Sequence, residues 1–163
     1  MPTWSDELAT HHPEMDRTHR EFIDHMTQVE AALTLELPEL LARYDAMLAH
    51  TVEHFAREDE WMLGSGYAAD NCHSLQHRQV LGALRDVRAI VEATPERRHI
   101  VGELLVELLR WFEHHARMAD AGLAEHLAEQ PQCPTPAGTL HGCGSDSCGD
   151  HAPTHATPAT ATA

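Results

Sequence analysis

Four long segments of the chain repeat apolar residues at spacings of three and four, and this pattern restricts the fold more than any other feature. Such spacing places the apolar side chains on one face of a helix. The segments run from about Asp16 to Leu33, from near Pro38 to the sequence GSGY, from about Asp70 to Val91, and from about Arg98 to Ala128. No segment alternates apolar and polar residues as a strand does. Four helices joined by short breaks predict an all-α protein, an antiparallel up-down-up-down four-helix bundle.

The composition changes near the end of the chain. Residues 1–129 carry the helical pattern, whereas residues 130–163 are rich in Pro, Gly, Ala and Thr and have almost no large apolar side chain. A segment of this kind buries too little apolar surface to offset its ordering entropy. We therefore expect one bundle domain over 1–129, followed by a disordered C-terminal tail over 130–163.

The tail contains the sequence HGCGSDSCGDH, which offers His141, Cys143, Cys148 and His151 as ligands for zinc or copper(I). The spacing is not that of a zinc finger, and the glycines leave the residues without a fixed geometry. A flexible extension without a site is the simpler interpretation.

Charge and cysteine usage limit the partners and the compartment. The chain has 11 Lys and Arg against 26 Asp and Glu, a formal charge of −15, so no basic patch is expected for nucleic acid or an anionic membrane. No apolar run approaches the length of a membrane span, and the first residues lack the pattern of a secretion signal. The four cysteines do not form the even spread of a disulfide framework. These features predict a soluble cytoplasmic protein, with a monomer favoured.

Histidine is the unusual residue, with fifteen copies. Residues four apart share a helix face, so His54 and Glu58 project together, as do His73 and His77. His19 and His115 also lie on the apolar faces of their segments. Each of the four predicted helices therefore directs at least one imidazole toward the interior.

Five inward imidazoles and a buried carboxylate favour a metal site over separate structural roles. Each buried polar group without a partner costs about 1–3 kcal/mol, and an ionised carboxylate costs more. A shared metal would satisfy all of these groups at once. Imidazole and carboxylate without thiolate suit iron, manganese or zinc.

Four motifs, one per predicted helix, resemble those of a known family. The sequences MDRTHREF, HTVEHFAREDEWM, CHSLQHRQVL and WFEHHARMADAGL are similar, in order, to the signatures D-x-x-H, H-F-x-x-E, H-x-x-x-H and W-x-x-x-H-x-x-x-x-D of hemerythrins, specifically of the bacterial hemerythrin-like domains. The resemblance covers about Trp4 to Leu127. One such motif alone would be weak, whereas four in the family's order are specific.

The resemblance implies a non-haem centre of two iron ions with an oxo or hydroxo bridge. By this resemblance His73, His77 and His115 bind one iron and His19 and His54 the other. Glu58 and Asp120 bridge the two ions. The two-histidine iron then has one open position, where dioxygen would bind.

Two points about the proposed ligands of the last helix stay open. His115 and Asp120 are five apart, roughly 140° around an ideal helix, so they either reach the centre from different sides or are joined by a local π-type turn. His114 is the alternative to His115, which we prefer because it continues the face of Trp111 and fits the family's order.

Other candidates receive lesser roles. His50 is expected at the rim of the site rather than as a ligand. Asp59 and Glu60 are expected on a solvated face. Cys72 is expected as structural filler. The residues that we cannot connect to the site are His11, His12, His25, His99 and His126.

The leading functional hypothesis is reversible dioxygen binding, as a carrier, store or sensor, without enzymatic activity. One alternative is a di-iron oxidoreductase that acts on dioxygen, peroxide or nitric oxide. The other is an iron or metal buffer. Ferritin-like oxidase chemistry is disfavoured because Glu96 and His99 are the only Glu-x-x-His pair, at a probable helix start.

Overall fold

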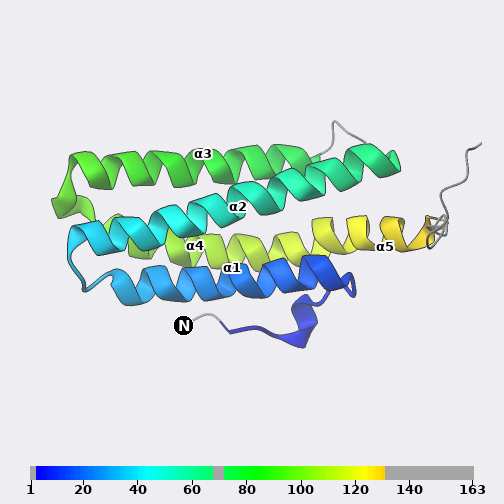
Figure 1. Ribbon diagram of the computed structural model, residues 1–163, viewed down its shortest axis with the longest axis horizontal. Coiled ribbons are helices and arrows are strands. Elements are labelled where there is room, and N and C mark those ends of the chain that lie inside the picture. The colour runs from blue at the N-terminus through cyan, green and yellow to red at the C-terminus, as the bar shows by residue number, and fades with distance from the viewer. Residues whose placement is uncertain (1–2, 68–71, 131–163) are drawn as a thin grey trace, which may run out of the picture. The chain divides into compact units, whose positions relative to one another are not determined.

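A computed structural model describes residues 3–67 and 72–130 of the chain. Four long helical rods run antiparallel to one another within this part (Figure 1). The first three rods are α1 (Pro13–Ala32), α2 (Leu37–Ser65) and α3 (Cys72–Ala93). The fourth consists of α4 (His99–His115), a π-helical turn labelled η3 (Ala116–Asp120) and α5 (Ala121–Glu129). The predicted up-down-up-down bundle is thus confirmed.

Local sequence explains where the helices begin and end. Pro13 opens α1, and the Nδ1 of His12 caps it by accepting from the backbone N–H of Met15 at 3.3 Å. Pro38 lies in the first turn of α2. Gly66 ends α2 in the left-handed conformation, with φ at 72°, which a residue without Cβ adopts at little cost. These bounds lie within a few residues of those expected from the sequence.

Two short 3-10 helices complete the described part of the chain: η1 (Asp6–Leu8) and η2 (Pro95–Arg97). The carboxylate of Asp16 binds the N-terminal segment to α1. Its Oδ1 accepts hydrogen bonds from the backbone N–H and the hydroxyl of Thr10, at 2.7 and 2.8 Å.

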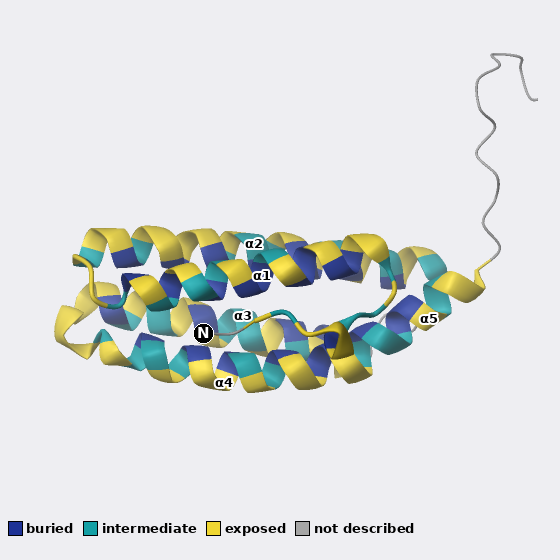
Figure 2. Cartoon of the chain, turned by 90° about the horizontal axis from the view of Figure 1, so that it is seen from below, coloured by how far each residue is buried: buried dark blue, intermediate teal, exposed yellow. Residues whose placement is uncertain are grey.

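Buried residues lie mainly on the helix surfaces that face the neighbouring helices, and exposed residues lie on the outer surfaces (Figure 2). The larger apolar cluster fills the half of the bundle where Met26, Tyr44, Leu84 and Leu105 meet. A smaller cluster contains Met15, Met62, Leu123 and Ala124. Along α1 and α2, the buried polar residues come between these two apolar groups in sequence, and in the fourth rod Asp120 comes between Ala116 and Leu123. The polar layer thus has apolar packing at both ends.

Some expected features differ in detail. The apolar spacing of the second segment also places Leu41, Leu48 and Trp61 on its apolar face, but they are only partly buried, because the interior stripe of α2 passes through Tyr44, Met47 and Met62. The fourth segment is not one regular α-helix, since η3 interrupts it. Asp70 and residues 131–163 of the predicted tail, with its Cys and His residues, lie outside the described residues. Within 3–67 and 72–130, no helix combines the length and apolar character that a membrane span requires.

Candidate metal centre

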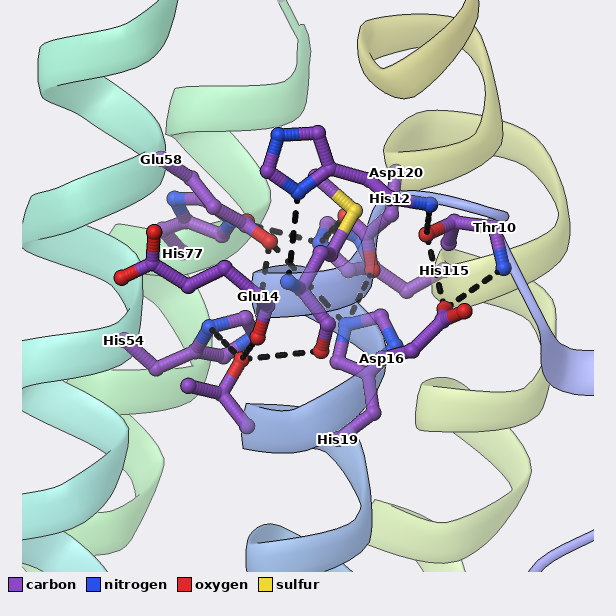
Figure 3. Close-up of polar contacts among 12 residues, drawn as sticks. Thr10, His12, Glu14, Asp16, His19, His54, Glu58, His77, His115 and Asp120 are labelled. Atoms are coloured by element: carbon purple, nitrogen blue, oxygen red, sulfur yellow. Dashed lines mark hydrogen bonds and ion pairs between the residues drawn. The ribbon is translucent and has the colours of Figure 1, made fainter.

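Seven buried side chains from the four rods converge in the polar layer of the bundle. Figure 3 labels His19, His54, Glu58, His77, His115 and Asp120 among them. Their ligand atoms form two groups, and within each group these atoms lie within 4.8 Å of one another. One group comprises Glu58, His73, His77, His115 and Asp120. The other comprises His19, His54 and Glu58. The seven residues nominated from the sequence are therefore brought together, and Glu58 belongs to both groups.

Each carboxylate divides its two oxygens between the two sets of histidines. Glu58 Oε2 lies 3.3 Å from His73 Nε2 and 3.1 Å from His77 Nε2, while its Oε1 lies 3.4 Å from His54 Nε2. Glu58 therefore spans from the three-histidine side of the layer to the two-histidine side.

Asp120 repeats this arrangement from the fourth rod. Its Oδ1 lies 3.1 Å from the Nε2 atoms of both His73 and His115, and its Oδ2 lies 3.1 Å from His19 Nε2. Two carboxylates that each present one oxygen to either side are a geometry suited to bridging two cations.

The π-helical turn explains how His115 and Asp120 meet. An α-helix would leave residues five apart on different faces, whereas a π-turn, with its i→i+5 hydrogen bonding, accommodates one more residue per turn. The turn η3 spans Ala116–Asp120, directly between the two side chains. Of the two possibilities that the sequence left open, the π-type turn is the one present.

Several of the buried polar atoms lack hydrogen bonds although they lie close to one another. Both nitrogens of His19, Oε1 of Glu58 and both oxygens of Asp120 have no hydrogen-bond partner among the described residues. Buried polar atoms are nearly always paired, so a cluster of unpaired ones needs a further partner. The donor set of imidazole nitrogens and carboxylate oxygens fits a metal ion of intermediate softness.

The electrostatics without a metal are unfavourable for the carboxylates. Burial, together with the charge of Asp120, raises the pKa of Glu58 to about 7. Burial would also raise the pKa of Asp120, but the surrounding imidazoles of His115, His19 and His73 hold it well below its ordinary value. An additional positive charge is therefore needed to keep both carboxylates ionised.

The pKa values of the histidines shift in opposite directions. Burial and the neighbouring imidazoles lower the pKa of His54 to about 3 and that of His77 to about 2, so both stay neutral and able to bind a metal. Burial opposes protonation of His73 as well, but the carboxylates of Asp120 and Glu58 outweigh it and raise its pKa to about 9. The same balance raises the pKa of His19. In the metal-free protein, the protonated imidazole of His73 thus supplies positive charge that a metal ion would otherwise provide.

A second layer of residues contacts the outer nitrogens of the histidines. The Nδ1 atoms of His54, His77 and His115 lie 3.2 Å from Thr18 Oγ1, 3.3 Å from Asp59 Oδ1 and 2.8 Å from Gln76 Oε1 respectively. His50 lies one step further out, with its Nε2 3.1 Å from the carbonyl oxygen of Thr18. Such contacts fix the tautomer and the orientation of a ligating imidazole.

Aromatic rings pack against histidines on both sides of the layer. Phe55 stacks on His77 with ring centroids 4.0 Å apart, and Trp111 stacks on His115 at 4.3 Å. Phe112 meets His19 edge-on at 5.1 Å. These rings restrict the rotation of the imidazoles.

The structure corrects or completes several expectations about neighbouring residues. His115 is buried and His114 exposed, which agrees with our preference between them. Asp59 is exposed as expected, but its carboxylate also contacts His77 and Ser74, which the sequence did not predict. Cys72 is not filler but exposed. Glu60 is exposed as expected.

Sequence reasoning missed Thr18, Asp59 and Gln76, since none of them forms a motif with the histidine that it contacts. Thr18 and Asp59 each precede or follow a motif residue by one position, but their partners belong to another helix. His12, which we could not connect to anything, caps α1 and packs on Trp61. His25 packs beside His50, with ring centroids 5.0 Å apart.

Comparison with known proteins agrees with this arrangement. Residues 9–127 match the family model of the hemerythrin HHE cation binding domain. The chain is 29% identical over 127 residues to a bacteriohemerythrin from Ralstonia nicotianae, covering 78% of this chain and 89% of the relative. It is 26% identical to bacteriohemerythrins from Stenotrophomonas maltophilia and Pseudomonas aeruginosa, which match 76% and 75% of this chain and 80% and 78% of their own lengths. The chain, with its four motifs converging in one buried layer, belongs to the hemerythrin HHE cation-binding domain family.

Proposed function

We propose that the bundle holds two iron ions and binds dioxygen reversibly. In this proposal His73, His77 and His115 bind one iron, His19 and His54 bind the other, and Glu58 and Asp120 bridge them. The observation that carries the proposal is the division of each carboxylate's oxygens between the two sets of histidines. A single-metal site would not need both carboxylates to span in this way.

The number of donors leaves one side of the centre open. Three histidines and two carboxylate oxygens, with one bridging oxygen, give six donors on the first side. Two histidines with the same shared donors give five on the second side. Ferrous ions held by these residues would supply the electrons that dioxygen takes up on binding, and an open position is what a metal needs to receive a small ligand.

The surroundings support binding rather than turnover of a larger substrate. His19 and His54, which form the open side, are almost completely buried. A surface cavity of about 480 Å³ does reach the layer, but it is lined by Cys72, His73 and Gln76 on the other side. An organic substrate in that cavity would meet the side without a vacant position, so the oxidoreductase alternative receives no support from it.

The relatives named bacteriohemerythrin, matched over most of their length, support the same function. Metal buffering is less suited to the site, because a buffer has to release its metal readily and these ligands are enclosed by apolar packing on both sides.

Iron content of three variants tests the ligand assignment. We expect two irons per chain in the unmodified protein and loss of this stoichiometry in Glu58→Ala and His77→Ala. The control is His50→Gln, because His50 contacts the carbonyl of Thr18, the carboxylate of Glu21 and the ring of His25, and belongs to neither group of proposed ligands. Two irons retained in both ligand variants would refute the assignment.

A further inference from the structure

The outer nitrogens of the five histidines do not have equivalent partners. His77 alone among them directs its Nδ1 at a carboxylate, Oδ1 of Asp59 at 3.3 Å. The corresponding partner of His54 is a hydroxyl, and that of His115 is a neutral amide oxygen. For the Nδ1 atoms of His19 and His73, the described part of the chain offers no hydrogen-bond partner. Within 3–67 and 72–130, the three-histidine side therefore carries one charged outer contact and the two-histidine side carries none.

Asp59 is held in this position by a second donor. The hydroxyl of Ser74 donates to the same Oδ1 at 3.0 Å. Ser74 and His77 are three residues apart on α3, so they lie on one helix face and converge on a single oxygen from α2. Both are buried, whereas the side chain of Asp59 is 49% exposed. The carboxylate thus reaches into the layer from the surface of the bundle.

The inner nitrogen of His77 explains why this contact matters. Its Nε2 faces Glu58 and His115, at 3.1 and 3.2 Å, so a metal would bind there. The proton of the neutral imidazole then resides on Nδ1 and is donated to Asp59. A carboxylate that accepts this hydrogen bond increases the basicity of the imidazole as a metal ligand more than a neutral acceptor does.

We infer that Asp59 is a positioning residue that fixes the ring of His77 and strengthens it as a donor to the three-histidine iron. A stronger donor stabilises the ferric state relative to the ferrous state. Asp59 therefore makes the centre easier to oxidise and slows the loss of bound dioxygen. This inference rests on the proposed function, and it assigns to an outer carboxylate a role in setting dioxygen affinity.

The test compares Asp59→Asn with Glu60→Gln in the full-length, iron-loaded protein. Asparagine has nearly the same shape and keeps an oxygen acceptor, so the change removes mainly the charge. Glu60 is exposed on the same helix and contacts none of the five histidines among the described residues, so its variant removes one charge without touching the layer. The readouts are the reduction potential of the centre and the rate of dioxygen release.

We expect Asp59→Asn to raise the reduction potential and to speed dioxygen release by up to roughly tenfold. This is the lower end of the effects known for outer contacts of metal ligands, because the carboxylate of Asp59 is half solvated. Glu60→Gln should change neither by more than a small fraction of this. Equal values in the two variants would overturn the inference.

A third readout does not depend on iron or dioxygen. In the zinc-loaded protein, the Nδ1 proton of His77 should resonate downfield of that of His115 and move upfield in Asp59→Asn, while the His115 proton stays in place. An unmoved His77 resonance would contradict the inference, as would an Asp59→Asn protein that binds neither iron nor zinc, since Asp59 would then be required for assembly. Failure of the unmodified protein to bind two irons would instead refute the proposed function itself.

Discussion

Replacing Glu58 by Gln should make the metal-free protein more stable while removing its ability to hold two irons. Glu58 is fully buried, and burial with the charge of Asp120 raises its pKa from 4.5 to about 7. A rise of this size corresponds to about 3 kcal/mol of unfolding free energy that is lost when the carboxyl ionises in the folded state. The proposed metal ligand is thus a source of instability whenever the metal is absent.

The direction of the pKa shift of Glu58 determines how the free energy of unfolding depends on pH. Because the folded-state pKa is the higher one, the stability of the unmodified protein is fully present below about pH 4.5 and is lost as the pH rises through 7. Glutamine does not ionise. The advantage of Glu58→Gln should therefore grow from pH 4.5 to 7 and remain at about 3 kcal/mol at pH 8.

Urea unfolding in the presence of a chelator, at pH 5 and pH 8, measures this difference. Glu60→Gln is the matched control, because this exposed carboxylate should change stability by less than about 0.5 kcal/mol. Iron content is measured on the same samples after loading. A Glu58→Gln protein that is less stable than the unmodified chain at pH 8 and still binds two irons would refute both the energetic argument and the bridging role.

Two further predictions follow from the same layer. Asp120 and Glu58 outweigh the effect of burial and raise the pKa of His73 to about 9. The metal-free protein should therefore lose about 2 kcal/mol of stability between pH 7.5 and 9.5, whereas the metal-loaded protein should not. Urea unfolding at the two pH values measures it, and a metal-free stability that stays constant over this range would contradict the assignment. Phe55→Ala, which removes the ring stacked on His77 at 4.0 Å, should cost about 3–5 kcal/mol in thermal or urea unfolding and weaken iron retention. Full iron retention in a destabilised Phe55→Ala protein would show that the stacking serves the fold alone.

The bundle and its inward histidines are predictable because both depend on local periodicity. His54 and Glu58, like His73 and His77, share a helix face by spacing alone. Spacing does not select Asp120, which lies five residues from His115 and meets it only through the π-turn of η3. That residue came from the family resemblance, and the geometry that brings it to the centre came from the structure.

The outer contacts were beyond sequence reasoning for a different reason. Asp59 meets His77 and Thr18 meets His54 across two helices, so each contact depends on the axial register and rotation of one helix against another. Periodicity fixes which face of a helix points inward, but not which residue of the neighbouring helix lies opposite. The exposure of Cys72 was not predicted for the same reason, because it depends on what packs near the start of α3.

Visible absorption during a cycle of oxygen exposure tests the central proposal most directly. The iron-loaded protein is reduced without air, exposed to dioxygen and then purged with inert gas. We predict an absorption band that appears with dioxygen and disappears on purging, over repeated cycles and with two irons per chain. A spectrum that converts once to the oxidised form and does not return on purging would contradict reversible binding and favour oxidoreductase or metal-handling chemistry. A chain that retains no iron would show that the converging histidines serve the fold alone.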